Sequence, residues 1–205
     1  MRDVYVSNGQ KSDYSDVKQI TSGEPVQDVS WTSDGRLLLD QLPVIRFVSA
    51  EGAVKGGITP ENGSAVFNSQ GCSDGHVIFT QAIMKARALN IWRSEADGTG
   101  LRKLTNGKND QFPRCSPDGK TVFFVDLAAN AYMKVPIDGG EAQRLAPVFS
   151  ETNGSYDISR DGNTAALGTY DFKARRPNIS LVSIESGTVL RTLEFDPRHV
   201  DHKTR

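Results

Sequence analysis

The sequence lacks any long apolar segment and any excess of one charge. No run of eighteen apolar residues exists, so no segment predicts a transmembrane helix, and the first residues lack the apolar stretch of a signal peptide. We expect any export signal or anchor to lie outside this chain. Lys and Arg number 24 against 25 Asp and Glu, a formal net charge of −1. That balance gives no general attraction to nucleic acid or anionic lipid, so we expect neither nucleic-acid binding nor direct membrane insertion.

The sequence also lacks the contiguous motifs of familiar enzymes. There is no Gly-rich loop leading into a Val-Ala-Ile-Lys strand, no His-Arg-Asp or Asp-Phe-Gly motif, and no Gly-x-Ser-x-Gly elbow. Of the three histidines, His76 is expected on a strand beside a turn, and His199 and His202 lie in a charged tail with too few neighbours for a metal site. We therefore predict no catalytic residue, no metal and no cofactor, and no enzymatic activity in this chain.

Cysteine is scarce. Cys72 and Cys115 each come just before an Asp-Gly turn, in what we interpret as matching places of neighbouring repeats. Equivalent residues of stacked sheets lie about 10 Å apart, too far for a disulfide. We predict two small buried hydrophobic residues that form no bond with each other.

What the sequence does contain is an Asp-Gly pair repeated at nearly even intervals. The pairs begin at Asp34, Asp74, Asp118 and Asp161, and an apolar run of strand length follows each. Between these units lie apolar segments joined by glycine turns, such as NIWRSEADGTGLRKLTNG from Asn90. Each unit of about forty residues therefore contains four short strands, which is typical of a propeller blade.

This periodicity predicts an all-β protein, a β-propeller with four complete four-stranded blades and half of another. The expected blades are approximately 3–23 (half), 26–63, 70–107, 111–148 and 155–195, with 196–205 a tail or the start of a further blade. We expect one partial domain over 1–205, a fragment of a six- to eight-bladed ring. The alternative is that the tail pairs with 3–23 in a strained fifth blade.

Local sequence supports antiparallel strands. The Asp-Gly pairs predict tight turns with glycine in the left-handed position. Continuous apolar runs, such as Val122–Val125, predict strands covered on both faces, and Trp31 and Trp92 are predicted in the core between blades. Gln81–Leu89 contains good helix formers but is short, so a long loop or a single turn is expected.

The phrases SPDGKTVFF, NIWRSEADGTGLRKLTNG and KVPIDGGEAQRLA resemble the TolB-type, WD-like propeller repeat. The likeness covers nearly the whole chain. In finer detail, QITSG, VPIDGGE and LEFDP look most like the C-terminal propeller of bacterial receptor-type Ser/Thr protein kinases. That resemblance implies an extracytoplasmic, periplasmic location and a sensor or docking role in signalling. TolB itself and the propeller of prolyl-oligopeptidase-like enzymes share the repeat.

The loops that join blades, and those that join the two hairpins within a blade, open on one face of a propeller. We predict that this loop face binds a protein, a peptide or an anionic ligand, because loops on a rigid scaffold carry recognition. An ordinary solvated rim is the alternative. The candidate binding residues are Lys85, Arg87, Asn109, Asp110, Lys173, Arg175 and Arg176.

Three functions follow from this interpretation. The first is a non-catalytic protein-interaction or ligand-sensing module, the extracytoplasmic part of a bacterial signalling protein. The second is a TolB-like periplasmic scaffold, and the third is the gating propeller of a prolyl-oligopeptidase-like serine peptidase. The sequences on either side of this chain would distinguish all three.

Overall fold

A computed structural model describes residues 3–7, 9, 15–61, 63–147, 156–171 and 176–194. The described chain is almost entirely β-strand, and its one helical element is a 3-10 turn, Met84–Ala86. Four antiparallel sheets of four strands each follow one another along the chain, preceded by a two-stranded pair. The predicted all-β propeller fold is confirmed at this level.

The strands of each sheet are consecutive in sequence. The two-stranded pair consists of β1 (Tyr5–Val6) and β2 (Lys18–Gln19). Sheet I contains β3 (Asp28–Trp31), β4 (Leu37–Gln41), β5 (Val44–Val48) and β6 (Val54–Ile58), and sheet II contains β7 (Ser64–Gly71), β8 (Val77–Ile83), β9 (Ala88–Ser94) and β10 (Arg102–Lys103). Sheet III contains β11 (Asp110–Cys115), β12 (Thr121–Asp126), β13 (Ala131–Pro136) and β14 (Gln143–Pro147), and sheet IV contains β15 (Tyr156–Ile158), β16 (Thr164–Asp171), β17 (Arg176–Ser183) and β18 (Val189–Glu194).

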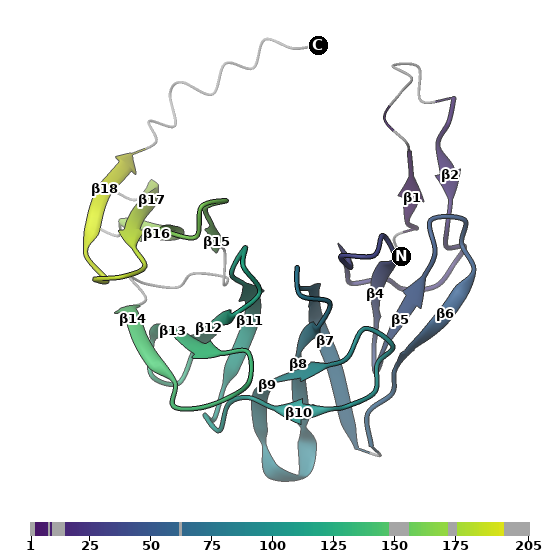
Figure 1. Cartoon of the computed structure of the whole chain (residues 1–205), viewed down its shortest axis with the longest axis horizontal. Coiled ribbons are helices and arrows are strands. Elements are labelled where there is room, and N and C mark those ends of the chain that lie inside the picture. The colour runs from purple at the N-terminus through teal and green to yellow at the C-terminus, as the bar shows by residue number, and fades with distance from the viewer. Residues whose placement is uncertain are drawn as a thin grey trace.

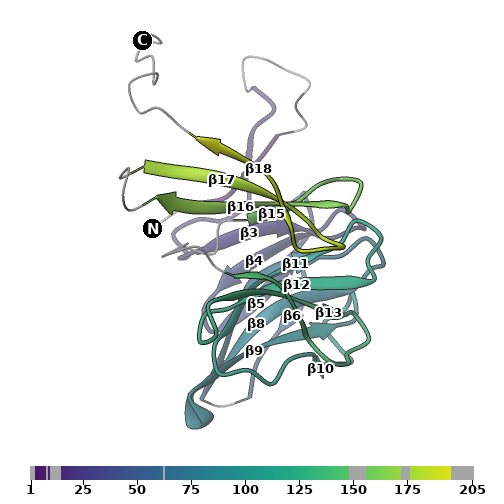
Figure 2. The same ribbon diagram turned by 90° about the vertical axis from the view of Figure 1, so that its left-hand side faces the viewer.

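The sheets succeed one another around an arc (Figure 1). The first strands β7, β11 and β15 lie on the inner side of this arc, and the last strands β10, β14 and β18 lie on the outer side. In the view turned by 90°, the strands run roughly along the direction in which Figure 1 is viewed (Figure 2). This radial arrangement places each sheet face to face with its neighbours, as the blades of a propeller are.

The core is divided among the junctions between sheets. One apolar cluster, which includes Leu38, Phe47 and Phe79, joins sheets I and II. A second, which includes Ile78, Ile91 and Phe124, joins sheets II and III. The third junction, between sheets III and IV, is filled by Phe123, Val125, Tyr132, Leu145, Tyr156, Ala165, Leu167 and Val182. The strands therefore bury both faces, which explains why their apolar runs do not alternate.

The repeated turns have the predicted chemistry. The glycine that follows each Asp has a positive φ, +84° at Gly35, +98° at Gly75, +72° at Gly119 and +74° at Gly162. Glycine has no Cβ and adopts this left-handed conformation at little cost. At Asp74, Asp118 and Asp161 the side chain accepts the backbone N–H two residues later, as in Asp118 Oδ1 with Lys120 N at 3.1 Å.

Two local predictions need correction. Trp31 is 50% exposed on β3, so it does not belong to the core between sheets, whereas Trp92 packs there as predicted. The segment Gln81–Leu89 is mostly strand, because β8 continues to Ile83 and β9 begins at Ala88 around the 3-10 turn. The single turn was predicted, but the cross-strand pairing of the apolar residues beside it extends the hairpin further than expected.

The prediction that Cys72 and Cys115 do not bond is wrong. They form a disulfide between sheets II and III, with their Cα atoms 5.6 Å apart. When the repeats are aligned on the Asp of the turn, Cys72 occupies the place of Ser116, one residue later than Cys115. In both units the residue at this place begins the turn: Gly75 N donates to Cys72 O and Gly119 N donates to Ser116 O. Because adjacent strand residues point to opposite faces, the two cysteines face each other across the junction.

Candidate active site

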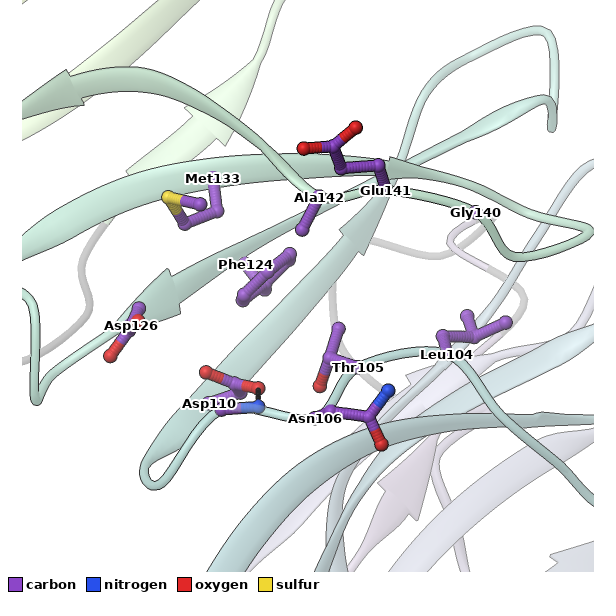
Figure 3. Close-up of a pocket in the computed structure, with 11 residues that line it drawn as sticks. Leu104, Thr105, Asn106, Asp110, Phe124, Asp126, Met133, Gly140, Glu141 and Ala142 are labelled. Atoms are coloured by element: carbon purple, nitrogen blue, oxygen red, sulfur yellow. Dashed lines mark hydrogen bonds between the residues drawn. The ribbon is translucent and has the colours of Figure 1, made fainter.

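A cavity of about 340 Å³ lies between sheets II and III, near the start of β11. It is formed by the segment that leads from β10 to β11, by one face of β12 and β13, and by the turn between β13 and β14 (Figure 3). Its size is at the lower end of the range for small-molecule sites. The lining residues are Leu104, Thr105, Asn106, Gly107, Asp110, Phe124, Asp126, Met133, Gly140, Glu141 and Ala142.

Two carboxylates stand opposite each other in this cavity. Asp110 is the first residue of β11 and Asp126 the last of β12, and the antiparallel register pairs them directly. Side chains of directly paired residues project to the same face of a sheet with Cβ atoms about 5 Å apart. The fold therefore brings together two acidic groups of the same charge.

Asp110 is almost completely buried, with 1% of its surface exposed. Its Oδ2 accepts hydrogen bonds from Gly107 N at 3.0 Å and from Asn90 Nδ2 at 3.5 Å. Its Oδ1 has no hydrogen-bond partner, and neither does the buried Oδ1 of Asn90. Two buried acceptors therefore lack a donor here, one on Asp110 in the cavity lining and one on Asn90 behind it, which is unusual because buried polar groups are normally paired.

Gly107 permits this packing. A Cβ at that position would overlap the carboxylate of Asp110. Any larger residue would displace either the carboxylate or the segment that carries Gly107. The glycine is thus required for close approach of the backbone to the acidic group.

Burial raises the pKa of Asp110, because the ionised form loses its hydration. The nearby hydroxyl of Thr105 and the N–H groups of Gly107 and Asn90 oppose this rise in pKa without cancelling it, and the charge of Asp126 adds to it. Asp110 is therefore a carboxyl group that holds its proton to higher pH than usual.

Asp126 is held by different contacts. Its Oδ1 accepts hydrogen bonds from Ala128 N and Ala129 N, both at 2.9 Å. These bonds fix the carboxylate at the end of β12, on the cavity wall. Glu141 is an exposed residue of the turn between β13 and β14 and borders the same cavity, while Phe124 and Met133 form an apolar wall between the acidic groups (Figure 3).

The predicted loop-face residues lie in different environments in the structure. Lys85 lies in the 3-10 turn and Arg87 directly follows it with a φ of +49°, and both side chains are exposed. Asn109 forms a parallel bridge with Leu89, and its Oδ1 accepts a hydrogen bond from Gln111 Nε2 at 2.7 Å. Asp110 is buried beside it rather than displayed at the surface.

The remaining predicted residues are not placed. Lys173 and Arg175 lie outside the described residues, and Arg176 begins β17 without a described side chain. Of the seven residues, the structure thus describes the side chains of four: Lys85 and Arg87 at the 3-10 turn, and Asn109 and Asp110 next to each other at the start of sheet III. Whether this face binds a partner stays a prediction.

The sequence interpretation missed Asp126 and Glu141. A signal for Asp126 was present, since it ends the apolar run Val122–Val125 just as Asp110 precedes the partner strand. In an antiparallel hairpin the start of one strand lies beside the end of the next. Glu141 has no comparable signal, because its position depends on where the next hairpin turn packs.

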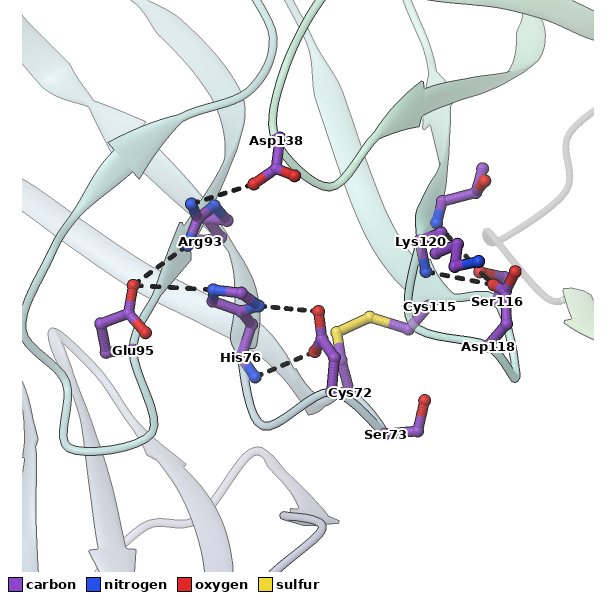
Figure 4. A network of polar contacts seen from close by, with 12 residues as sticks. Cys72, Ser73, His76, Arg93, Glu95, Cys115, Ser116, Asp118, Lys120 and Asp138 are labelled. Carbon is purple, nitrogen blue, oxygen red and sulfur yellow. Dashed lines mark hydrogen bonds and ion pairs between the residues drawn. A yellow bond between two sulfur atoms is a disulfide. The ribbon is translucent and has the colours of Figure 1, made fainter.

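A second polar cluster joins sheets II and III on the side of the Asp-Gly turns (Figure 4). His76 Nδ1 lies 2.7 Å from Asp74 Oδ2, and its Nε2 lies 3.6 Å from Glu95 Oε1. Arg93 contacts Glu95 at 3.2 Å and, across the junction, Asp138 at 3.3 Å. The ion pair of Arg93 with Asp138 and the disulfide both cross the junction and fasten the two sheets to each other.

Within the described ranges, no three or more His, Cys, Asp or Glu side chains are arranged to hold a metal ion. No described helix is long and apolar enough to cross a membrane.

No protein-family model matches the chain, and no curated protein matches it in sequence. Solved structures match its fold. A putative TolB from Agrobacterium tumefaciens is 17% identical with a TM-score of 0.68, and the match covers 88% of this chain and 65% of that one. A gluconolactonase from Xanthomonas campestris is 14% identical with a TM-score of 0.67, covering 88% of this chain and 66% of that one.

A third match, Kuenenia stuttgartiensis hydrazine synthase, is 16% identical with a TM-score of 0.62, and covers 85% of this chain and 50% of that one. The chain thus spans between half and two thirds of the length of these structures. At such identities the likeness establishes the propeller fold alone, and it confirms the TolB-type resemblance at that level.

The prediction of a non-catalytic interaction or ligand-sensing module, and not an enzyme, is contradicted. Structures that share the fold include a gluconolactonase and a hydrazine synthase, and TolB is one match among several. The missing motifs did not exclude catalysis, because a propeller assembles its sites from separate strands and turns. The cavity that contains Asp110, Asp126 and Glu141, called the carboxylate pocket below, is assembled in this way, from the start of β11, the end of β12 and the turn between β13 and β14.

Proposed function

We propose that this propeller is a hydrolase of small esters or lactones, with its active site in the carboxylate pocket. The observation that carries the proposal is the direct pairing of Asp110 with Asp126 in a cavity where Asp110 Oδ1 is buried without a partner. A pair of carboxyl groups in different environments is the usual basis for separate acid and base roles. The gluconolactonase among the matched structures supports the choice of substrate class.

In this reaction Asp126 is the general base and Asp110 the general acid. Asp126 removes a proton from water as the water oxygen bonds to the carbonyl carbon. The bond from that carbon to the leaving oxygen then breaks, and Asp110 gives its proton to the leaving oxygen. Exchange with solvent returns one proton to Asp110 and takes one from Asp126. The raised pKa of Asp110 keeps its proton available closer to neutral pH.

The test is hydrolysis of a panel of small esters and lactones by the purified chain and three variants. Asp110→Asn and Asp126→Asn should each lower kcat/KM by about 10²–10⁴-fold, the usual contribution of a general acid or base. Asp157→Asn changes an exposed carboxylate of β15 in sheet IV and serves as the control. Equal rates for all four proteins, or no turnover of any member of the panel, would contradict the proposal.

We also propose an extracytoplasmic, periplasmic location. Disulfides persist in oxidising compartments, and the bond between Cys72 and Cys115 supports such a location. The finer resemblance to the propellers of receptor-type kinases supports it as well. Fractionation of the producing bacterium should find the protein outside the cytoplasm. An alkylating reagent for free thiols should then modify neither Cys72 nor Cys115. Free thiols in a cytoplasmic fraction would contradict this location.

A further inference from the structure

One face of sheet I is only partly covered. Apolar residues in and beside β1 and β2 pack against Leu37 and Leu39 of β4 on this face. Trp31 and Val29 of β3 are the direct register partners of Leu37 and Leu39, so their side chains project to the same face. Yet Val29 is 45% exposed and Trp31 is 50% exposed. The face is therefore covered along β4 and open along β3.

Strand β1 has a free edge toward the inner side of the arc. In Figure 1, β1 lies on the inner side of the two-stranded pair and β2 on the outer side. The backbone of Val4 is directed toward β2, because its oxygen accepts from Ile20 N at 2.8 Å and its N–H donates to Thr21 Oγ1 at 2.9 Å. Successive residues of a strand direct these groups to opposite edges, so the N–H and C=O of Tyr5 point inward. No described strand pairs with β1 at that edge.

The three complete junctions show what occupies the equivalent place. The first two strands of each sheet form its inner hairpin, and β7 contacts both β3 and β4, while β11 contacts both β7 and β8. Tyr156 of β15 is 8% exposed, and its hydroxyl donates to Phe112 O of β11 at 2.7 Å. The first strand of each of these sheets thus packs against the inner hairpin of the preceding sheet. Within the described chain, β3 faces no such hairpin.

Trp31 stands where the other junctions have a close contact. It is the last residue of β3, the place that Gly71 has in β7 and Cys115 in β11. Gly71 lies against Thr32 and Cys115 is bonded to Cys72, and each of these partners opens the turn of the preceding inner hairpin. Because Trp31 is much larger than glycine or cysteine, a hairpin that packs on it needs a small residue at the opening of its turn.

We propose that the free edge of β1, together with Val29 and Trp31, binds a β-hairpin of another polypeptide that resembles the inner hairpins of this chain. The second strand of that hairpin pairs antiparallel with β1, and its apolar side chains cover Val29 and Trp31. Main-chain hydrogen bonds supply affinity in such strand addition, and the side chains supply specificity. The surface belongs to sheet I and the carboxylate pocket to sheets II and III, so this inference does not depend on the proposed hydrolase.

A synthetic peptide that copies residues 109–126, the inner hairpin of sheet III, tests the inference on the whole chain. Serine replaces Cys115 in the peptide, which contains no tryptophan, so all tryptophan emission comes from the protein. We expect binding to shift the emission of Trp31 to shorter wavelength and to protect it from iodide, while Trp92, packed between sheets I and II, stays unchanged. The amide of Tyr5 should exchange at least about ten-fold more slowly. A scrambled peptide should do neither, and failure of the hairpin peptide to bind would overturn the inference.

Variants then locate the binding surface. Trp31→Asp should weaken binding of the peptide at least about thirty-fold, the loss expected for a buried aromatic anchor of an interface. Trp31 is exposed in the free chain, so the variant should keep its fold, which circular dichroism checks. Leu190→Asp, at an exposed apolar residue of β18, is the matched control and should leave the affinity unchanged. Unaltered binding by Trp31→Asp, or equal weakening by both variants, would overturn the assignment to this surface.

Two other occupants of the surface are distinguishable outcomes. Sedimentation of the chain alone should show a monomer in which iodide quenches Trp31. A dimer in which Trp31 is shielded would overturn the inference in favour of a second copy of this chain. Shielding in a monomer that is lost when the chain is cut after Glu194 would overturn it in favour of the chain's own last residues.

Discussion

At the scale of single residues, Asp110 combines several features that each lower the stability of the fold. It is buried, one of its oxygens has no partner, and another carboxylate faces it. Like charges directly opposite each other on a sheet destabilise the pair. Strain of this kind is common at active sites, where function and stability conflict.

The raised pKa of Asp110 makes the stability of the fold depend on pH. Below its ordinary value of 3.8 both folded and unfolded chains hold the proton, and the group costs nothing. As pH rises from there to the higher folded-state value, the unfolded chain ionises first, so stability falls. Asp110→Asn should therefore raise the Tm at pH 7 by a few degrees, with a gain that disappears as the pH approaches 4.

Thermal unfolding of the wild-type chain and of Asp110→Asn, measured from pH 4 to pH 8, checks this expectation. Asp157→Asn is the matched control, because that carboxylate is exposed and its removal should leave the pH profile unchanged. A pH-independent difference between Asp110→Asn and the wild type would show that burial of the charge is not the cause.

At the scale of elements, one contact recurs at the first two junctions between sheets. The last residue of an inner strand meets the first turn residue of the preceding unit, as Gly71 meets Thr32 and Cys115 meets Cys72. Ile158, the last residue of β15, occupies the corresponding place in sheet IV. A Cβ on Gly71 would lie 2.5 Å from the carbonyl oxygen of Trp31 and from the Cα of Thr32. The backbones of sheets I and II therefore approach each other closely at this first junction.

Gly71→Ala should destabilise the protein by about 2–4 kcal/mol, because the clash is with backbone atoms that cannot move aside without separating sheets I and II. Urea unfolding measures the change. Gly63→Ala is the control, since a Cβ there meets nothing within 4 Å and only its φ of +78° opposes the substitution. Its cost should stay near 1 kcal/mol. Equal costs for both variants would contradict the tight junction.

The disulfide closes a separation of 43 residues in sequence. Constraint of the unfolded chain by a loop of this size contributes about 2–4 kcal/mol. The double variant Cys72→Ala/Cys115→Ala should lose that amount, and a reductant should lower the urea midpoint of the wild type but not of the double variant. No effect of the reductant on the wild type would contradict the bond.

At the scale of the whole molecule, the interactions that stabilise the fold differ from one junction between sheets to the next. Repeat proteins stabilise each unit through its neighbours. Sheets II and III share an apolar cluster, a disulfide and the ion pair of Arg93 with Asp138, whereas the strands β1 and β2 contain two residues each. Regions with few buried contacts open at lower free energy than the core.

Hydrogen exchange should therefore be slowest in β8 and β12, which are each one of the two central strands of sheets II and III. Amides of β1 and β2 should exchange at least about a hundred-fold faster. Exchange measured by NMR or mass spectrometry under native conditions checks the order. Uniform protection across β1, β8 and β12 would indicate that the junctions do not differ.

The sequence predicted the fold because its repeats encode it locally. The Asp-Gly turns and the apolar runs recur with one period, so four sheets followed from pattern alone. The disulfide was missed because its geometry depends on an offset of one residue between Cys72 and Cys115. The pocket was missed because the burial of Asp110 depends on how sheets II and III pack, and the position of Glu141 depends on how the next hairpin turn of sheet III folds. Pairwise contacts across a junction leave no contiguous signal in a single sequence.

The one-residue offset of the cysteines amounts to a transferable rule for engineering. Two adjacent units should be linkable by cysteines at the turn-opening place of the earlier unit and at the strand-ending place of the later one, provided that the strand-ending place has room for a side chain, which Gly71 at the first junction lacks. Ser116→Cys combined with Ile158→Cys would apply the rule to sheets III and IV and tie three successive sheets into one cross-linked array.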